Sequence, residues 1–308
     1  MERYHQSEPI PKAFVWRRLQ SLAGIFLSLF IIEHLLTNSR AALFIGDDGK
    51  GFIKAVNGIH DLPYLQIIEI LFIAAPFALH ALWGIKYLFT AKFNSFPTNG
   101  SRPYLPYRKN QAYSWQRITS WVLLVGVIAH VVQMRFLNYP EEVKVGDQTY
   151  YMVEVHNDEG LSTVAERLGV SLYTASAIET YHASVFQDES QVSAQRAKQA
   201  QAFANTLASF EPTDDQVVAS AKDFGTADLL VVRNVMQSFW MIGLYSIFVI
   251  SAVYHAFNGL WTFLITWGIT LTAVSQRLAR KLSIGLMLLI GFLGLAAAWG
   301  TFWINLRY

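Results

Sequence analysis

The chain has 308 residues, of which 53% are hydrophobic and only 15% are charged, whereas an average soluble domain has about 25% charged residues. This composition does not fit an ordinary water-soluble protein. The absence of cysteine excludes disulfides and the usual thiolate-held zinc and iron–sulfur sites. A formal net charge of only +2 gives no reason to expect nucleic acid as a partner.

Five segments are long and apolar enough to cross a membrane, since a span needs about 20 mostly apolar residues. They lie near residues 14–38, 63–90, 116–137, 229–258 and 282–304. The first apolar run, Leu19 to Asn38, is longer than the roughly 7–15 residues of a signal-peptide core, so we expect it to be retained as a helix. The stretch from Asn258 to Ser275 contains glycine and tryptophan and is expected to be an interfacial connector. The sequence therefore predicts an all-α integral membrane protein with a bundle of five transmembrane helices.

Lysine and arginine at the ends of the spans predict the orientation, because short cytoplasmic loops are enriched in them. They gather before the first span, between the second and third, and before the fifth: Arg17, Arg18, Lys92, Arg102, Arg108, Lys109, Arg117, Arg277, Arg280 and Lys281. We therefore expect a multi-pass protein, surrounded by membrane lipid, with a cytoplasmic N-terminus and an external C-terminus.

The connection between the third and fourth spans is much longer than a usual helix–helix connection. From Glu141 to Asp223 it has 14 acidic and 5 basic residues, a net charge of −9. Residues 161–183 and 191–209 have a helical composition. We expect residues 1–139 to hold the first three spans, 140–226 to form a small acidic external cap, and 227–308 to hold the last two spans. An unstructured, solvated loop is the alternative for the insertion.

Four histidines, His34, His80, His130 and His255, fall in four different predicted spans. An ionisable side chain in hydrocarbon is costly and normally faces the bundle interior, and a single such histidine is most often hydrogen-bonded to a neighbouring helix. Chain direction and a rise of about 1.5 Å per residue place His34 and His130 in the outer half and His80 and His255 in the inner half. Two pairs at two depths can hold two stacked macrocycles, so we predict two bis-histidine haems.

Other readings of the histidines fit this arrangement less well. A structural zinc site would bring four ligands together rather than separate two pairs. A proton relay of isolated histidines would not need paired depths, although the sequence leaves it open. Small residues such as Gly24, Gly126 and Gly243 could let flat rings approach the helices, but ordinary helix packing explains them equally well.

Polar residues at the inner end of the first span could receive haem propionates. Arg17, Gln20 and Ser21 are the candidates, with Trp115 and Gln116 on the third span. A positive cytoplasmic flank with an aromatic belt accounts for most of them as well.

Glu69 is a carboxylate about two turns inside the outer end of the second span, which is costly unless it is paired or protonated. It precedes His80 by 11 residues, close to a whole number of turns in a regular α-helix, so the two side chains should share one face. We predict that Glu69 is a proton acceptor beside an outer quinol site.

Several segments of the sequence resemble one known family. They read RRLQSLAG, FLSLFIIEHLLTN, IIEILFIAAPFALHALWGIK, WQRITSW, AHVVQMR and YHAFNGLWTFLITWGITLTAVSQR. They are similar to the type B, di-haem cytochrome b membrane-anchor subunit of succinate:quinone oxidoreductase (succinate dehydrogenase) and quinol:fumarate reductase. The similarity covers all five spans. The insertion at 140–226 is longer than in other members, and some members carry histidine at the position of Gln20.

The resemblance implies that His80 and His255 ligate the iron of a proximal haem b near the cytoplasmic face, and that His34 and His130 ligate the iron of a distal haem b. It implies an anchor in the bacterial cytoplasmic (inner) membrane for a flavoprotein subunit with FAD and an iron–sulfur subunit. The chain would transfer electrons between the iron–sulfur clusters and a membrane quinone, usually menaquinone, without holding the succinate site. Both succinate oxidation and fumarate reduction fit. Alternatives are the quinone-reactive cytochrome b of a hydrogenase or formate dehydrogenase, and a haem-free polytopic transporter.

Overall fold

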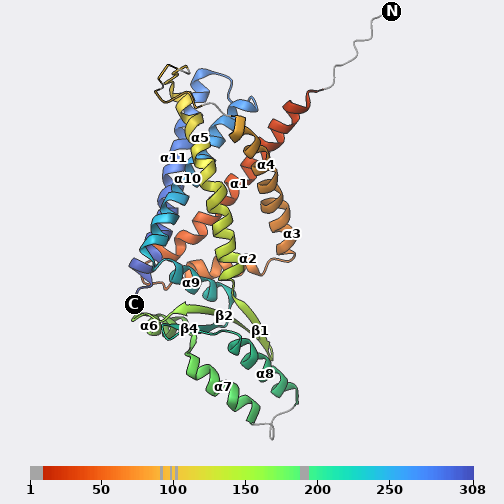
Figure 1. Cartoon of the computed structure of the whole chain (residues 1–308), viewed down its shortest axis with the longest axis vertical. Helices are drawn as coiled ribbons and strands as arrows, with labels where there is room; N and C mark the ends of the chain where they lie inside the picture. The colour runs from red at the N-terminus through yellow and green to blue at the C-terminus, as the bar shows by residue number, and fades with distance from the viewer. Residues whose placement is uncertain (1–9, 91–92, 98, 101–102, 188–193) are drawn as a thin grey trace, which may run out of the picture. The chain divides into compact units, whose positions relative to one another are not determined.

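The computed structural model describes residues 10–90, 93–97, 99–100, 103–187 and 194–308 (Figure 1). Among these residues, five helical segments are long and apolar enough to cross a membrane. They are Lys12–Leu43, Leu65–Thr90, Arg108–Leu137, Phe239–Thr266 and Ala273–Asn305. The prediction of a helical membrane protein with five spans is therefore confirmed, but the chain is not all-α, because the insertion between the third and fourth spans contains a four-stranded sheet.

Three of the five spans contain a π-helical turn. The first span is the helix α1 (Lys12–Leu43) and the fourth is α10 (Phe239–Thr266). The second span combines α3 (Leu65–Glu69), η1 (Ile70–Ala74) and α4 (Ala75–Thr90). The third combines α5 (Arg108–Val131) with η2 (Val132–Leu137), and the fifth combines α11 (Ala273–Gly300) with η3 (Thr301–Asn305). The segments η1, η2 and η3 are π-helical, and each such turn inserts an extra residue into the helix.

The expected interfacial connector at 258–275 is mostly wrong. Helix α10 continues through Asn258 and Gly259 to Thr266, and only residues 267–272 separate it from α11. The side-chain amide of Asn258 donates to Gln116 Oε1 at 2.7 Å and to Ala112 O at 3.4 Å. Because this polar group finds acceptors on α5, it does not end the helix, and one interior glycine costs only about 1 kcal/mol.

The fourth span begins ten residues later than expected, at Phe239 instead of residue 229. The preceding residues form a separate helix, α9 (Phe224–Val235). Asp223 caps α9: its backbone is extended, and its side chain accepts a hydrogen bond from the backbone N–H of Thr226 at 2.9 Å. An aspartate at this position satisfies one of the free N–H groups at a helix start.

The insertion between the third and fourth spans folds into a mixed α/β cap, which we define as residues 141–235. In chain order it contains β1 (Glu141–Val145), β2 (Gln148–His156), α6 (Leu161–Leu168), β3 (Ser171–Tyr173), α7 (Ala175–Gln187), α8 (Ala194–Ala208), β4 (Gln216–Ala221) and α9. The strands form an antiparallel sheet in the order β1-β2-β4-β3. The unstructured alternative is therefore wrong, and the helical stretch expected at 161–183 is interrupted at Gly169, which has a φ of 67°.

The chain divides into two compact units. The first holds the described residues up to Glu33 together with Gln66–Leu124 and Ile250–Leu289, and those of its residues that the structure describes form only helices and their connections. The second holds His34–Leu65, Val125–Val249 and Ile290–Tyr308, including the whole cap.

In the second unit the cap and the adjoining helix ends share one hydrophobic core. Its buried side chains come from α2 (Lys50–His60), from the cap, from α10 and from the C-terminal segment; they include Phe52, Leu161, Leu230, Ile242 and Phe302. Helix α9 packs against both α2 and β2. A second core, with Met152, Phe203 and Leu207, lies between the sheet and the helices α7 and α8. Apolar burial therefore joins the cap to the helix ends.

A buried ion pair fastens the C-terminal segment to the cap. The side chain of Arg233 is only 1% exposed, and its Nη1 and Nη2 donate to the two carboxylate oxygens of Asp158 at 2.6 and 2.8 Å. Its Nε donates to the backbone oxygen of Leu306 at 2.7 Å. Burial alone would raise the pKa of Asp158, but the hydrogen bonds and positive charge of Arg233 outweigh burial and hold this pKa below its usual value.

Candidate functional site

In the first unit, His80 of α4 faces His255 of α10. The centres of their rings are 6.0 Å apart and the ring planes make an angle of 81°. The Nδ1 atom of His80 is 3.0 Å from the backbone oxygen of Gln20, and that of His255 is 3.1 Å from the backbone oxygen of Gln116. Since a carbonyl oxygen can only accept, each Nδ1 carries the proton, and each Nε2 is left with a lone pair for a metal.

In the second unit, His34 of α1 faces His130 of α5. Their ring centres are 5.9 Å apart, with an angle of 73° between the planes. The Nδ1 atom of His130 is 3.1 Å from the hydroxyl oxygen of Tyr245 on α10. The structure therefore brings together the same two pairs of histidines that chain direction and depth predict.

The separation of the rings fits a metal held between two Nε2 atoms. Two metal–nitrogen bonds of about 2 Å, with about 1.1 Å from each nitrogen to its ring centre, place the centres about 6 Å apart. Direct edge-to-face contact of the rings also falls in this range. The bonded Nδ1 atoms favour the metal, because a ligating histidine usually donates its other N–H to a fixed acceptor.

Each pair supplies two ligands and no more. Within the described ranges, no group of three or more His, Asp or Glu side chains could hold one metal ion together. A metal held by two opposed imidazoles can take its four remaining ligands from a macrocycle, which is the arrangement of a bis-histidine haem. The donor set therefore fits haem and does not fit a four-ligand zinc site.

Gly24 allows the ring of His80 to lie close to α1. A Cβ atom built at Gly24 would lie 3.0 Å from Cε1 and 3.2 Å from Nδ1 of His80. Gly126 instead makes room for Phe248, because a Cβ atom built at Gly126 would lie 2.6 Å from the Phe248 ring. A Cβ atom built at Gly243 would have no atom within 4 Å. Gly84, a fourth small residue that the sequence offers, has only Gln20 Nε2 within 4 Å, so Gly24 alone among these glycines is a neighbour of a histidine.

The polar residues predicted to receive propionates have different surroundings. Arg17 is exposed, and the hydroxyl of Ser21 accepts a hydrogen bond from Trp267 Nε1 at 3.3 Å. Gln20 contributes its backbone oxygen to His80. Two other N–H groups in the same unit, Arg117 Nη1 and Trp261 Nε1, are buried with no hydrogen-bond partner among the described residues. Both groups can only donate, so they suit an anionic ligand group.

Glu69 is the last residue of α3 and directly precedes the π-helical turn η1. The extra residue in such a turn rotates the following helix by roughly 100° relative to a regular α-helix. The spacing argument that placed Glu69 and His80 on one face is therefore wrong. Its expected role as a proton acceptor loses that support and keeps only its depth in the span.

Sequence reasoning missed the partners of the histidines. Besides Gln116, the hydroxyl of Thr119 lies 3.4 Å from Nδ1 of His255, and Tyr245 bonds to His130. Tyr245 precedes His255 by ten residues on α10, which corresponds to about 15 Å along the helix. The depth of Tyr245 in its span could therefore have placed this residue at the level of His34 and His130.

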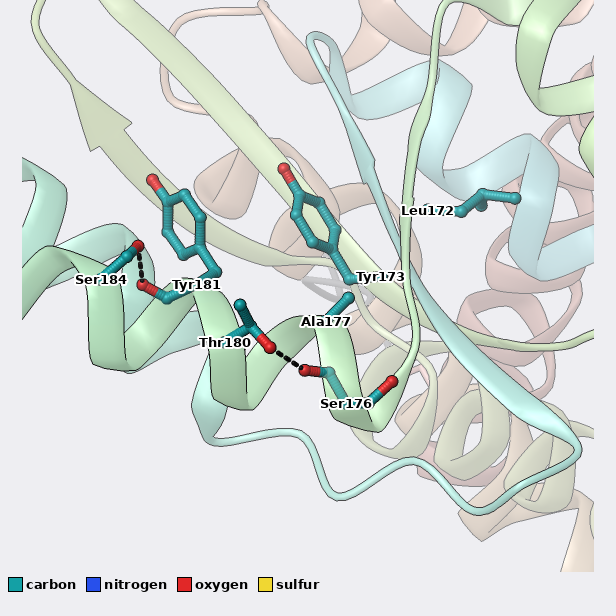
Figure 2. A pocket seen from close by; sticks show the side chains of 7 residues that line it. All are labelled: Leu172, Tyr173, Ser176, Ala177, Thr180, Tyr181 and Ser184. Carbon is teal, nitrogen blue, oxygen red and sulfur yellow. Dashed lines mark hydrogen bonds between the residues drawn. The ribbon is translucent and has the colours of Figure 1, made fainter.

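The cap has an open depression of about 520 Å³ lined by residues of β3 and α7 (Figure 2). Leu172, Tyr173, Ser176, Ala177, Thr180, Tyr181 and Ser184 line it. Neither His34 nor His130, the histidine pair of the same unit, is among the residues that line this depression.

The fold and the histidines together define a helical membrane protein with two pairs of facing histidines, His80 with His255 and His34 with His130. Over 287 residues, which are 93% of this chain, the sequence is 24% identical to the succinate dehydrogenase cytochrome b558 subunit of Bacillus subtilis (strain 168), 96% of which is covered. The resemblance to the cytochrome b membrane subunit of succinate dehydrogenase is therefore confirmed. No family model matches the chain, and no solved structure matches it.

Proposed function

We propose that this protein is the cytochrome b subunit of a succinate dehydrogenase and that it binds two haems b, one at each histidine pair. The observation that carries the proposal is the geometry of the pairs: ring centres 5.9 and 6.0 Å apart, with Nδ1 hydrogen-bonded in His80, His130 and His255. Similarity to a cytochrome b558 subunit over almost the whole chain supports it.

A bis-histidine haem carries single electrons and has no open position for oxygen. The chain's own residues would position it. The backbone oxygens of Gln20 and Gln116 orient His80 and His255. Arg117 Nη1 and Trp261 Nε1, which are buried without a hydrogen-bond partner among the described residues, would donate to the propionates of the haem between His80 and His255. The surrounding apolar helices exclude water.

The name of the relative supports a complex with a flavoprotein subunit, which carries FAD, and an iron–sulfur subunit. Both would dock on the cytoplasmic face, where the lysines and arginines at the ends of the spans gather. The His80/His255 haem would lie nearer that face and the His34/His130 haem nearer the external face. Electrons would reach a membrane quinone, with menaquinone as the expected substrate and Glu69 as its proton acceptor.

A quinone site at the external side would make electrons cross the bilayer. Moving one elementary charge against 100 mV costs about 2.3 kcal/mol, so the proton-motive force could drive reduction of a low-potential quinone by succinate. An uncoupler added to whole cells should then slow succinate:menaquinone activity, and unchanged activity would contradict the transmembrane route.

Purification of the tagged chain from membranes in mild detergent tests the assignment. We expect a flavoprotein with bound FAD and an iron–sulfur protein to co-purify, with succinate:quinone reductase activity. Haem without these subunits would contradict the assignment and favour the cytochrome b of a hydrogenase or formate dehydrogenase. A preparation without haem would favour a polytopic transporter.

A further inference from the structure

His130 is held by side chains, whereas His80 and His255 are held by backbone oxygens. The Nδ1 atom of His130 lies 3.1 Å from the hydroxyl oxygen of Tyr245, and that hydroxyl donates to Oε1 of Gln133 at 3.0 Å. The rings of His130 and Tyr245 meet edge to face, with centres 5.8 Å apart. His130, Tyr245 and Gln133, from the third span and α10, therefore form one chain of hydrogen bonds.

The donor-to-acceptor direction of these hydrogen bonds agrees with a metal on Nε2 of His130. A neutral imidazole that ligates through Nε2 carries its proton on Nδ1, so Nδ1–H must donate to the tyrosine oxygen. The tyrosine hydroxyl is then free to donate onward, and the amide oxygen of Gln133 accepts it. In the opposite direction the proton would sit on Nε2, and the histidine could not ligate.

Helices α5 and α10 support each other's histidine. Helix α5 carries His130 and also supplies the Gln116 oxygen that holds His255. Helix α10 carries His255 and also supplies the Tyr245 hydroxyl that holds His130. The difference is chemical: a backbone oxygen is present whatever the residue, whereas the tyrosine oxygen depends on one side chain.

We propose that Tyr245 is a positioning residue that fixes His130 and sets the reduction potential of the haem between His34 and His130, separately from that of the other haem. This inference rests on the proposed function, because it requires a haem at that pair. An acceptor on Nδ1–H makes the imidazole more basic, and a more basic ligand favours ferric over ferrous iron. Hydrogen bonds around the ligands are an established lever on haem potential.

A purely structural tyrosine is the competing reading. The ring of Tyr245 also packs against Phe248, with centres 6.3 Å apart, and Tyr245→Phe would keep this packing while removing only the hydroxyl. Tyr254, another tyrosine of α10, serves as a matched control, since Tyr254→Phe removes a hydroxyl that is not the one bonded to His130.

The test is a potentiometric titration of both haems in the purified complex, followed by their visible absorbance. Wild type, Tyr245→Phe and Tyr254→Phe are compared, and His130→Ala identifies which step belongs to the His34/His130 haem. In Tyr245→Phe we expect this haem to move to a more positive potential while the other stays unchanged. In Tyr254→Phe the His34/His130 haem should keep its wild-type potential.

No shift in Tyr245→Phe, or an equal shift of both haems, would overturn the role of Tyr245 and leave the proposed function intact. A wild-type complex without haem would instead overturn the proposed function. If Tyr245→Phe does not retain the haem, Gln133→Leu replaces it in the titration. That variant keeps the tyrosine hydroxyl but removes its acceptor, so the same haem should shift positively by a smaller amount, and an unchanged potential would overturn the proposal.

Discussion

The two histidine pairs have almost the same ring separation, 6.0 and 5.9 Å, but they are held differently. His80 and His255 are both bonded to backbone oxygens of neighbouring helices. His130 is bonded to a side-chain hydroxyl. The same separation of two histidine rings can therefore accompany two kinds of support for the histidine. A substitution leaves a backbone oxygen in place, whereas it can remove a side-chain hydroxyl and so change one histidine pair alone.

The two pairs also differ in what supports their helices. The unit with His80 and His255 contains helices and their connections, whereas the unit with His34 and His130 includes the cap and a shared hydrophobic core. We therefore expect each histidine pair to lose its haem independently of the other. The stability of the unit with the cap should depend on the kind of buried contacts that are typical of a soluble domain.

The largest effect should come from removing the ligands. His255→Ala should abolish the haem between His80 and His255 and leave the other, and His130→Ala should do the reverse. Haem content and the number of steps in a redox titration measure both outcomes. Loss of both haems from either variant, in a complex that still assembles, would mean that the two sites are not independent.

The buried ion pair of the cap should have the next largest effect. Arg233→Ala leaves the carboxylate of Asp158 without its partner, and breaking a buried pair costs about 3–5 kcal/mol. On heating, this variant should lose the His34/His130 haem at a lower temperature than the wild type, with less change at the other haem, as recorded by absorbance.

Arg167→Ala is the matched control for Arg233→Ala. Arg167 Nε lies 3.0 Å from Asp48 Oδ1, but its side chain is 36% exposed, and exposed pairs contribute about 0–1 kcal/mol. Equal destabilisation by the two variants would show that burial of the Arg233 pair does not matter.

The unit with the cap should also respond to pH through Asp228 on α9. Desolvation by burial raises the pKa of Asp228 to about 6. The folded state therefore holds this proton more tightly than the unfolded state, and its stability falls as the pH rises from about 4 to about 6. Asp228→Asn should stabilise the unit by roughly 1–3 kcal/mol at pH 7.5, and this gain should shrink toward pH 5. Thermal melts of wild type and Asp228→Asn at pH 7.5 and pH 5 check this prediction. An equal gain in stability at both pH values would contradict a raised pKa for Asp228.

The smallest effect concerns the close approach of His80 to α1. In Gly24→Ala the new methyl group would lie 3.0 Å from the ring of His80, so the ring must shift by a few tenths of an ångström at a cost of about 1 kcal/mol. We expect a shifted potential for the His80/His255 haem. Gly243→Ala adds a methyl group with nothing within 4 Å and should change neither haem.

Much of the membrane part could be predicted because it depends on local properties. Runs of apolar residues define the five spans, and alternating chain direction sorts His34 with His130 and His80 with His255. What escaped prediction depends on contacts between distant segments. Strand β2 pairs with β4, for example Val153 with Ala219, and no local pattern reveals this partner.

The same limit applies around the site. Asn258 stays inside a helix because Gln116 on another span accepts its hydrogen bond, and composition alone cannot reveal that partner. The π-helical turn after Glu69 changes the face on which that residue lies, although the sequence there reads as a regular helix. The bond from His130 to Tyr245 likewise requires two spans to be placed side by side.

Haem content per chain tests the central claim most directly. A pyridine haemochrome assay on the purified complex, divided by the amount of this chain from quantitative amino-acid analysis, gives the ratio. Two independent histidine pairs predict two haems b per chain in the wild type and one in either His130→Ala or His255→Ala. One haem or none in the wild type would contradict the account.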